Sequence, residues 1–494
     1  MSIAIIGSGY GGAVAAYRLA SQGITVDLIE MGKDWDATAA PGKVFPSMLS
    51  PDGRSFWFEN RTILPYRYFF GLDVVNRTIP SRAGVLAVEK FAHMQVYAGR
   101  GLGGGSLVNG GMAVVPPRSF FHQVLPDVDV DEMYGTYFPR AQERLRVRSI
   151  SRDIVHYSPY YSFARAATEH NSAAGYDTVD VPNVYDPNYL RMESFGRVSR
   201  SATGGEVIYG NNHGKNSLTR TYLQAALATG RVRVSTMTEV TRLRRAASGT
   251  YTLSLREIVD DGTVVAESER TYDRVILAAG SVGTARLLLR AQAEGDLTGL
   301  DDSLGHGWGP NGNTMVMRQV PGAVGAHQST IPVRALDAWD DTDASVFAEI
   351  APLPVGIETR ALGYLAITNN PNQAQYSIDA SGTLALSWTP DMHAPSITAA
   401  RAVIDRLNQV NGGSTLTTML DGGKAYSDHF TYHPLGGAVL GQTTDMNGEL
   451  HGAPGLFVID GSLIPAKIGV NPFVTITALA ERIMDKLIAA GRFS

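Results

Sequence analysis

Residues 2–32, SIAIIGSGYGGAVAAYRLASQGITVDLIEMG, decide the fold of this chain. They contain a short apolar run, a glycine-rich turn, an amphipathic stretch through Leu19 and a second apolar run that ends at Glu30. This order predicts a strand, a tight turn, a helix and another strand, which form a βαβ unit. We therefore expect an α/β fold with a Rossmann-like nucleotide-binding domain.

The glycines of this stretch have the spacing of a dinucleotide-binding turn. Gly7 permits a tight turn, Gly9 lets the backbone approach a pyrophosphate, and Gly12 allows close packing of helix and strand. The unpaired N–H groups at the start of the helix would face the phosphates. Glu30 can accept hydrogen bonds from ribose hydroxyls and would repel a 2′-phosphate. The pattern favours a bound dinucleotide over a plain turn at a helix start, and it leaves NAD and FAD open.

Two later segments favour FAD. Residues 273–291, DRVILAAGSVGTARLLLRA, predict a strand followed by a helix, and residues 455–487 predict a strand ending at Asp460 and a helix opening at Asn471 and Pro472. Strands near residues 3, 26, 275 and 457 would form a mostly parallel sheet. NAD-linked dehydrogenases rarely need the C-terminus to complete such a domain. Asp460 could bond a ribityl or pyrophosphate oxygen, and the helix start at Pro472 could aim its positive end at a flavin carbonyl.

Long insertions separate these strands, so the nucleotide-binding domain should be discontinuous. We predict an FAD-binding domain made of residues 1–34, 92–113, 215–306 and 448–494. The remaining segments, residues 35–91, 114–214 and 307–447, would form a substrate-binding domain on a mostly antiparallel sheet with helices. The class is thus α/β, or α+β for the whole chain.

Composition narrows the function further. The chain has 494 residues, 44% hydrophobic and 18% charged, as expected of an ordered globular protein. A net charge of −5 makes nucleic acid a poor partner. The absence of cysteine excludes disulfides, thiolate metal sites, a cysteine nucleophile and flavin attachment through sulfur. No run reaches the roughly 18 apolar residues of a spanning helix, and the compartment stays open: secreted if a signal peptide was removed, cytoplasmic if Met1 is the native start.

Several motifs together resemble one enzyme family. These are GSGYGG (7–12), GRGLGGGSLVNGGMAV (99–114), GPNGN (309–313), FAEIAP (347–352), YHPLGG (432–437) and the DGSLIP and GVNPFVTITALAER stretches within 460–482. The chain is similar to the glucose–methanol–choline oxidoreductases over almost its whole length. Within that family it most resembles the bacterial cholesterol oxidases that bind FAD without a covalent bond.

The resemblance implies roles for individual residues. His433 and Asn471 would face a sterol hydroxyl and the flavin, and Glu349 would carry a proton in a second step. Residues 101–112 would wrap the flavin ring, and Val240 would touch the adenine. Beyond the residues of the first stretch, the resemblance implies cofactor contacts for Gly101, Gly105, Ser106, Asn109, Gly110, Met112, Val240, Gly461, Pro472 and Phe473. Met112, Asn311 and Phe430 would line the route to the flavin.

The stretch DHFTYHPLGG, residues 428–437, allows three interpretations. His429 and His433 could bind a metal from one helix face, yet no glutamate stands between them and Pro434 would stop the helix. A serine hydrolase needs a G-x-S-x-G elbow, which the chain lacks. Alcohol oxidation fits better, because neutral imidazole can hold the O–H while hydride leaves the carbon. We therefore assign His433 to the site, expect no metal, and interpret His429 as a packing or surface residue.

Glu349 and Asn471 each have an alternative interpretation. Glu349 lies in the apolar run SVFAEIAPLPVGIE, where burial would raise its pKa enough for it to take and return a proton. A solvent-facing glutamate on a strand edge is the alternative. Asn471 could simply cap the helix that follows it, a role that is compatible with contacting the flavin.

Residues 56–75 hold seven aromatic side chains. They could form a core layer, or a lid through which a sterol passes from a membrane surface to an apolar pocket. Sterol and O2 are thus the expected partners, with transient membrane contact and a monomeric chain.

The resulting hypothesis is oxidation of a 3β-hydroxysterol with release of H2O2, followed by Δ5 to Δ4 isomerisation. Two alternatives remain: a dehydrogenase that passes electrons to another acceptor, and a flavin- or sterol-binding protein without turnover.

Overall fold

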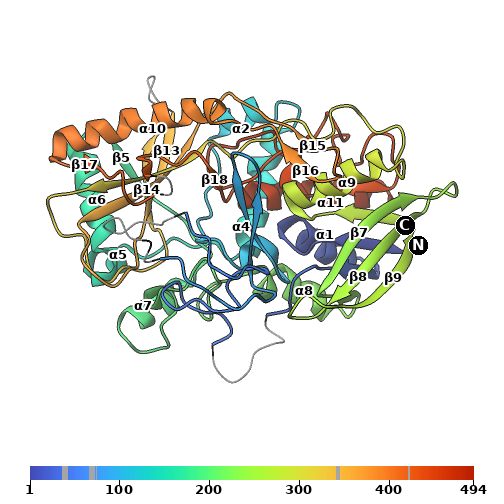
Figure 1. Ribbon diagram of the computed structural model, residues 1–494, viewed down its shortest axis with the longest axis horizontal. Coiled ribbons are helices and arrows are strands. Elements are labelled where there is room, and N and C mark those ends of the chain that lie inside the picture. Colours follow the sequence, from blue (N-terminus) through green and yellow to red (C-terminus); the bar gives the residue numbers. More distant parts are fainter. Residues whose placement is uncertain (36–42, 66–72, 74, 341–344, 421–422, 494) are drawn as a thin grey trace.

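The computed structural model describes residues 1–493 except 36–42, 66–72, 74, 341–344 and 421–422. Two halves lie side by side along the long axis of the molecule. One half holds both termini, α1, α9, α11 and β7 to β9, and the other holds α5, α6, α10, β13 and β14 (Figure 1).

A five-stranded parallel sheet forms the centre of the first half. Its order is β19 (Leu456–Val458), β10 (Arg274–Leu277), β1 (Ile3–Ile6), β2 (Val26–Ile29) and β6 (Val232–Ser235). Every pairing is parallel, with Ile5 of β1 opposite Ile276 of β10 and Leu28 of β2. The predicted sheet of four strands is confirmed, and β6 adds an edge strand that the sequence did not predict. The strands come from the predicted segments 1–34, 215–306 and 448–494, while the domain boundaries themselves stay a prediction.

Helix α1 (Tyr10–Ser21) joins the two ends of the chain. It packs against α11 (Phe473–Ala489) and α8 (Tyr222–Ala228). The approach to the C-terminal segment is very close, because a Cβ added to Gly11 would lie 1.6 Å from the carbonyl oxygen of Ile459. A Cβ on Gly12 would lie 2.0 Å from the carbonyl oxygen of Gly7. Only glycine fits at these two positions, so the turn and the β19 end are held together by backbone contact.

The second half is built on a six-stranded antiparallel sheet. Its order is β17 (Ser414–Thr415), β11 (Asn313–Gln319), β14 (Ala361–Thr368), β13 (Val346–Ala351), β12 (Arg334–Ala338) and β5 (Asp177–Asp180). Helices α10 (Pro390–Asn411) and α6 (Ser162–Ala173) pack on it. All eight residues of β14 are buried. The predicted antiparallel sheet with helices is confirmed.

Smaller elements connect the two halves. A three-stranded sheet of β18 (Phe430–Thr431), β4 (Gln95–Gly99) and β3 (Leu86–Lys90) lies near the middle (Figure 1). The other strands are β7 (Thr238–Arg245), β8 (Tyr251–Ile258), β9 (Val264–Tyr272), β15 (Tyr376–Ile378) and β16 (Leu384–Leu386). The other helices are α2 (Arg118–Val124), α3 (Val130–Glu132), α4 (Phe138–Arg144), α5 (Arg152–Tyr157), α7 (Pro187–Ser194) and α9 (Gly280–Ala293). Short helical turns, some of them 3₁₀, are η1 (Gly104–Ser106), η2 (Met133–Tyr137), η3 (Pro159–Tyr161), η4 (Ala202–Gly204), η5 (Leu218–Arg220) and η7 (Gly461–Leu463).

The aromatic segment 56–75 is only partly described. Phe56 is fully buried and packs edge-on against Tyr209, while Trp57 and Phe58 are half-buried. These contacts fit a core layer for the first part of the segment. The expected lid falls largely on residues 66–72 and 74, which lie outside the described residues. Among the residues that are described, no helix has the length and apolar character needed to cross a membrane.

Candidate active site

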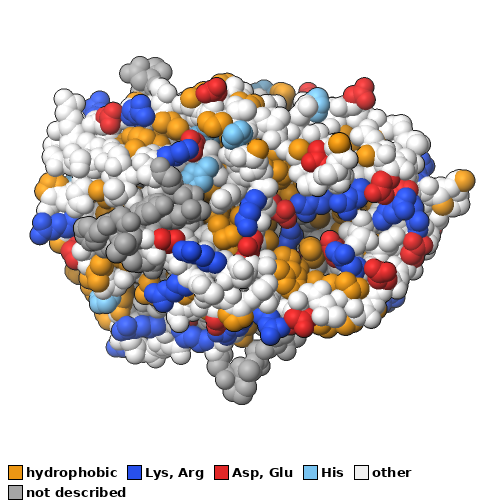
Figure 2. Space-filling model, viewed as in Figure 1, with side chains coloured by type: hydrophobic (Ala, Val, Ile, Leu, Met, Phe, Trp, Pro, Cys, Tyr) orange, Lys and Arg blue, Asp and Glu red, His pale blue; other side chains and the backbone are white. Residues whose placement is uncertain are grey.

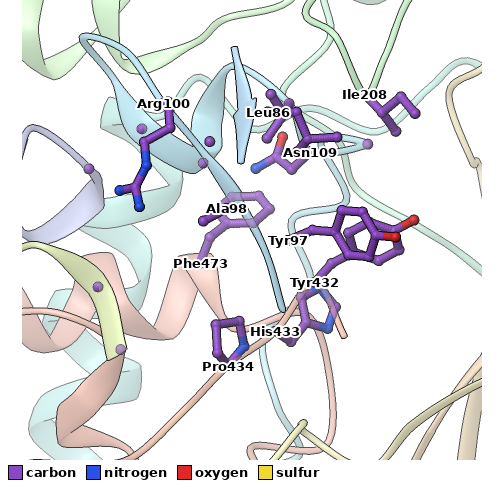
Figure 3. Close-up of a pocket in the computed structure, with 18 of the residues that line it drawn as sticks. Leu86, Tyr97, Ala98, Arg100, Asn109, Ile208, Tyr432, His433, Pro434 and Phe473 are labelled. Carbon is purple, nitrogen blue, oxygen red and sulfur yellow. The ribbon is translucent and has the colours of Figure 1, made fainter. Parts of the chain in front are cut away.

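One cavity of about 720 Å³ runs from the parallel sheet to the antiparallel sheet. At one end it meets the carboxyl ends of β1, β2 and β10, where ligands of open α/β sheets bind. At the other end it reaches Ala351 of β13 and Leu365 of β14. Figure 3 shows Asn109, Tyr432, His433 and Phe473 around the same space. The cavity is therefore long enough to bring residues of both halves to one ligand.

The end at the parallel sheet has room for a ligand against the backbone. Gly7 has a φ of +94°, which the tight turn after β1 requires. A Cβ added to Gly9, Gly105 or Gly280 would meet no atom within 4 Å, and all three residues line the cavity. Their missing side chains leave a smooth cradle of peptide groups, as a bound dinucleotide needs.

Glu30 lies at this end with both carboxylate oxygens held. Oε2 accepts hydrogen bonds from the Ser8 hydroxyl at 2.6 Å and from the Ser8 N–H at 3.1 Å. Oε1 accepts from the Gly32 N–H at 2.9 Å. The side chain is buried and lines the cavity beside Val240, the residue expected near the adenine. These donors keep the carboxylate oriented while it retains capacity to accept from a ribose hydroxyl.

Asp460 ties two strand ends together. Its Oδ1 accepts from the N–H and hydroxyl of Ser462, at 2.9 and 2.5 Å. Its Oδ2 accepts from the Gly280 N–H at 2.9 Å and from the Thr284 hydroxyl at 2.6 Å. Burial raises the pKa of Asp460, and these hydrogen bonds oppose the rise. The Asp460 carboxylate accepts hydrogen bonds from four protein donors and thereby fixes the turn that follows β10. Its contact with a cofactor stays a prediction.

The loop of residues 101–112 approaches α1 and α11 through an aromatic pair. Asn109 Nδ2 donates to the Tyr10 hydroxyl at 2.6 Å. The Tyr10 ring stacks on Phe473 with centroids 5.0 Å apart and an angle of 17° between the ring planes. The sequence prediction did not include Tyr10, although it stands directly after Gly9 and could have been found as the first helical residue. Asn109, Tyr10 and Phe473 all line the cavity.

The His433 imidazole is neutral and contacts Asn313, which, like Tyr10, the sequence prediction missed. Burial lowers the pKa of His433 to about 4. Its Nδ1 lies 2.9 Å from Asn313 Nδ2 and 3.3 Å from Asn313 Oδ1. With Asn313 Nδ2 donating to Nδ1, Nε2 carries the ring hydrogen and donates. In the other tautomer, Nδ1 carries the hydrogen and donates to Asn313 Oδ1, and Nε2 is an acceptor. Asn313 ends the quoted motif GPNGN, so the signal that could have identified it was present.

Glu349 and Asn471 are buried next to each other at the antiparallel-sheet end of the cavity. Asn471 lines the cavity, and Glu349 is 1% exposed behind the lining residues. Burial raises the pKa of Glu349 to about 8, and the neighbouring Asn471 amide opposes that rise. Within the described chain, no hydrogen bond of ordinary geometry reaches either Glu349 oxygen or Asn471 Oδ1. Glu349 is thus a buried strand residue, and the alternative of a solvent-facing glutamate is wrong.

The structure does not bring every predicted residue to the cavity wall. The predicted residues that line it are Gly7, Gly9, Glu30, Gly105, Asn109, Gly110, Met112, Val240, His433, Asp460, Gly461, Asn471, Pro472 and Phe473. The predicted residues that do not line it are Gly12, Gly101, Ser106, Asn311, Glu349 and Phe430. Asn311 is fully buried, donates to the Val470 carbonyl at 2.8 Å and accepts from the Ile468 N–H at 2.8 Å. Its role on a route to the flavin stays a prediction.

The far end of the cavity is apolar. It is lined there by Leu353, Val355, Ile357, Leu365 and Met419, and Ile357 is 52% exposed. Figure 2 shows apolar side chains near the middle of the visible face, with Lys and Arg side chains beside them. A ligand with a large apolar body can therefore be covered at this end.

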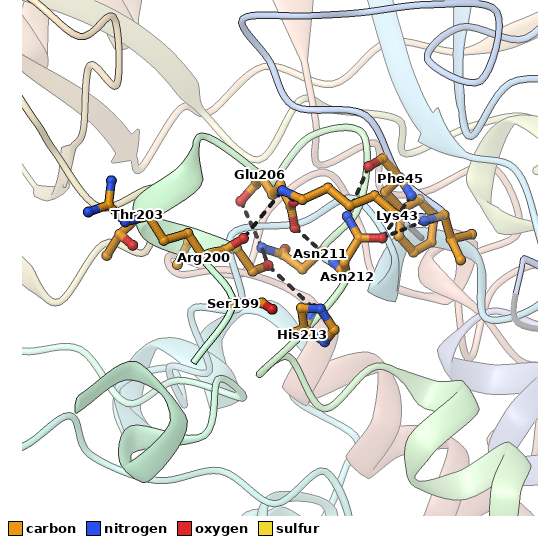
Figure 4. A network of polar contacts seen from close by, with 12 residues as sticks. Lys43, Phe45, Ser199, Arg200, Thr203, Glu206, Asn211, Asn212 and His213 are labelled. Carbon is orange, nitrogen blue, oxygen red and sulfur yellow. Dashed lines mark hydrogen bonds and ion pairs between the residues drawn. The ribbon is translucent and has the colours of Figure 1, made fainter. Parts of the chain in front are cut away.

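A polar network holds one wall of the cavity (Figure 4). The buried Glu206 accepts from Lys43 Nζ at 2.6 Å and from the Asn212 N–H at 2.9 Å. Asn212 Oδ1 accepts from the N–H groups of residues 44 and 45, at 2.7 and 3.0 Å. The chain then continues to Met48, which lines the cavity. This network fixes a loop segment as a side wall.

The stretch 428–437 is a strand end and not a helix. Phe430 and Thr431 form β18, so His429 and His433 stand on either side of a strand. Asp428 binds Lys424 Nζ at 2.6 and 2.7 Å and lies 3.4 Å from His429 Nδ1. Over the described ranges, no group of three or more His, Asp or Glu side chains could hold a metal ion.

Comparisons with known proteins agree on one family. Sequence models of GMC oxidoreductases match residues 76–295, 311–421 and 383–480, and a model of NAD(P)-binding Rossmann-like domains matches residues 5–40. A cholesterol oxidase of Mycobacterium tuberculosis is 25% identical over 97% of this chain and 90% of its own length. A cholesterol oxidase of Acinetobacter baumannii is 23% identical over 98% and 94%. The crystal structure of pyridoxine 4-oxidase from Mesorbium loti superposes with a TM-score of 0.62 at 15% identity, over 99% of both chains, which shows the shared fold.

Proposed function

Given that the chain belongs to the GMC oxidoreductase family and uses FAD to act on alcohols, we propose that its substrate is a 3β-hydroxysterol. The sterol is oxidised to the 3-ketone, O2 is reduced to H2O2, and the product is isomerised from the Δ5 to the Δ4 ketone. The observation that carries this proposal is Glu349, a buried carboxyl with a pKa raised to about 8 that lies next to Asn471, a residue of the cavity lining.

FAD is held without a covalent bond in this proposal. The glycine cradle around Gly9 takes the pyrophosphate, Glu30 the ribose, and the loop 101–112 with Asn471 and Pro472 the ring end. When bound, FAD accepts the hydride that leaves the alcohol carbon and passes its electrons to O2. The free space beside Gly9, Gly105 and Gly280 and the position of the cavity at the strand ends support this placement.

His433 holds the alcohol in the oxidation step. At neutral pH its imidazole is uncharged because burial lowers its pKa to about 4. The amides of Asn313 and, at 3.5 Å, of Asn311 face Nδ1, and the tautomer that they favour sets whether Nε2 donates to the hydroxyl oxygen or accepts its hydrogen. In the tautomer with its ring hydrogen on Nδ1, donated to Asn313 Oδ1, Nε2 is free to accept the hydroxyl proton as the hydride leaves.

Glu349 acts in the isomerisation step. Its carboxylate takes a proton from C4 of the ketone, the double bond moves from C5–C6 to C4–C5, and the carboxyl returns the proton to C6. A carboxyl with a pKa near 8 can both take and return a proton close to neutral pH. The apolar residues at the far end of the cavity favour the sterol body, and full-length similarity to two cholesterol oxidases supports this substrate class.

The test is to add cholesterol to the purified holoenzyme in air. We expect H2O2 together with a rise in absorbance at about 240 nm from the conjugated enone. Flavin bleaching without peroxide would favour a dehydrogenase that acts on the sterol with another electron acceptor. A flavin spectrum that no sterol changes would exclude the proposed substrate and favour another apolar alcohol, or a binding protein without turnover.

A pair of histidine variants tests the site. His433→Ala should retain FAD and lose oxidation by a factor of roughly 10² to 10⁴. His429→Ala is the matched control, because His429 stands four positions earlier and does not line the cavity. Loss of FAD from the His433 variant, or equal losses of activity in both variants, would contradict the assigned role.

A further inference from the structure

Among the described residues, Arg77 is the one charged side chain that lines the apolar end of the cavity. The other side chains of the lining that carry a charge at neutral pH belong to the parallel-sheet end, and they are Glu30, Arg100, Glu239, Arg286, Arg290 and Asp460. A charge beside an apolar wall is unfavourable unless a group of opposite charge answers it. Arg77 therefore needs an explanation that the oxidation described above does not give.

The backbone of Arg77 is fixed at the rim of the apolar end. Its N–H donates to Thr62 Oγ1 at 2.8 Å, and its carbonyl oxygen accepts from the Thr62 N–H at 2.9 Å. Leu64, two residues further along the same segment, is buried in one cluster with Leu353 and Leu365, which line the apolar end. The Arg77 side chain is exposed while it lines the cavity, so it stands where the cavity meets solvent.

The Arg77 guanidinium has no carboxylate partner within the part of the chain that the structure describes. The arginines before and after it differ in this respect. Arg61 Nη2 lies 2.7 Å from Asp73 Oδ2, and Arg82 Nε lies 3.8 Å from Asp260 Oδ2. A guanidinium presents its donors as a planar fork that fits a carboxylate with two parallel hydrogen bonds. Arg77 is thus available to an anionic group of a ligand.

The two polar ends of such a ligand would point in opposite directions. His433, which holds the alcohol in the proposed function, is desolvated enough for burial to lower its pKa to about 4. Arg77 stands at the solvent rim of the same cavity, and the lining around it is apolar, with Leu64, Val75 and Met419. A ligand with its hydroxyl at His433 would therefore place its far end toward Arg77.

We propose that the substrate is an apolar alcohol whose far end carries a carboxylate, and that Arg77 binds this carboxylate. This inference rests on the proposed function, and within it the substrate is a 3β-hydroxysteroid with an acidic side chain. Arg77 determines specificity and takes no part in the chemistry, because it contacts the end of the molecule that does not react.

The test compares 3β-hydroxy-5-cholenoic acid with its methyl ester, both dissolved below the concentration at which they form micelles. The two molecules differ by one charge at the far end. At low salt we expect kcat/KM to be about three- to tenfold higher for the acid, the range of a hydrogen bond to a charged group at a solvent-facing position. The difference should lie in KM with kcat unchanged. It should shrink as salt screens the charges.

Variants of Arg77 separate charge from other differences between the two steroids. Arg77→Gln should raise KM for the acid to the value for the ester, and Arg77→Glu should make the acid the poorer substrate. Arg77→Lys should retain part of the preference, because it keeps the charge without the planar fork. Arg61→Gln is the matched control, since Arg61 belongs to the same segment, faces Asp73 and does not line the cavity. It should leave the ratio of acid to ester unchanged.

The outcomes that overturn the proposal are distinct from failure of the proposed function. Equal kcat/KM values for acid and ester, or a preference that survives Arg77→Gln, would overturn it while sterol oxidation stands. An effect of Arg77→Gln that is confined to cholesterol in anionic lipid vesicles would assign the charge to a lipid surface and would also overturn it. If neither steroid nor cholesterol is oxidised, the proposed function fails and this inference fails with it.

Discussion

The two ends of the cavity treat their buried carboxyl groups in opposite ways. At the parallel sheet, Glu30 accepts three hydrogen bonds and Asp460 accepts four. At the antiparallel sheet, Glu349 has no hydrogen bond of ordinary geometry within the described chain, and its pKa rises to about 8. Carboxylates that accept several hydrogen bonds orient turns and ligands, whereas a desolvated carboxyl with only the Asn471 amide beside it can exchange a proton near neutral pH.

The difference follows from the backbone around each group. Strand ends and glycine turns expose N–H groups, and these supply donors to Glu30 and Asp460. Inside β13 the backbone groups are consumed by pairing with β12 and β14, so Glu349 meets side chains only. A central strand is therefore a place where a carboxyl is left without donors unless a side chain provides one.

Replacing Glu349 should give the largest effect. Glu349→Gln keeps the shape and removes the titrating proton, so isomerisation should slow by a factor of about 10³ while alcohol oxidation continues. The measurement compares H2O2 release with the rise in enone absorbance. Glu358→Gln is the control, because Glu358 belongs to the same segment but is exposed, does not line the cavity and accepts from the Val324 and Gly325 N–H groups. An unchanged isomerisation rate in Glu349→Gln would remove this residue from the mechanism.

Two neighbouring glycines separate folding from cofactor binding at the other end. Gly11→Ala would force a Cβ to within 1.6 Å of the Ile459 carbonyl oxygen, and we expect a loss of roughly 3 kcal/mol or more of unfolding free energy. Gly9→Ala meets no protein atom within 4 Å, so its fold should be retained while FAD affinity falls. Denaturation of the apoproteins and FAD titration check the two effects. Similar stabilities of both variants would contradict the contact between α1 and the C-terminal segment.

The pH dependence of stability should also distinguish the two ends. Because the pKa of Glu349 is raised in the folded protein, the folded state retains a proton that the unfolded state releases. The contribution of Glu349 to the unfolding free energy is fully present below the pKa that the group has in the unfolded chain. As the pH rises to about 8, this contribution falls by a few kcal/mol. The unfolding free energy of the parent minus that of Glu349→Gln should therefore decline from about pH 5 to about pH 8 and then level off. A flat difference would mean that the carboxyl is not desolvated.

The same contrast explains what could be predicted from the sequence. The turn around Gly7 and the strands near residues 3, 26, 275 and 457 follow from local patterns, because glycine spacing and apolar runs are properties of neighbouring residues. Glu349 was recognisable as an acid in an apolar run. Strand β6 was missed because VRVS is only four residues long and none of the four is fully buried.

Hydrogen bonds between residues far apart in the sequence could not be predicted from local patterns. Asn313 and His433 stand 120 positions apart, and Lys215 reaches the Asn109 carbonyl across 106 positions. Nothing in the polar stretch around Lys215 shows that its ammonium group is buried. Such contacts depend on how two sheets are placed relative to each other, which is set by packing across the whole chain.

The smallest effect should come from removing one donor from the saturated end. The Ser8 hydroxyl donates to Glu30 Oε2 at 2.6 Å and accepts from the Gly103 N–H at 3.0 Å, so it joins the first turn to the loop 101–112. Ser8→Ala leaves the Ser8 and Gly32 N–H groups on Glu30 and should cost about 1 to 2 kcal/mol of unfolding free energy. Ser248→Ala, at an exposed serine whose hydroxyl lies 2.9 Å from that of Thr250, is the control and should be nearly neutral. If the two changes had equal effects, the hydrogen bond from Ser8 to Glu30 would not contribute to the stability of the parallel-sheet end. The contrast between Glu30 and Glu349 would then be one of hydrogen-bond count without an energetic consequence.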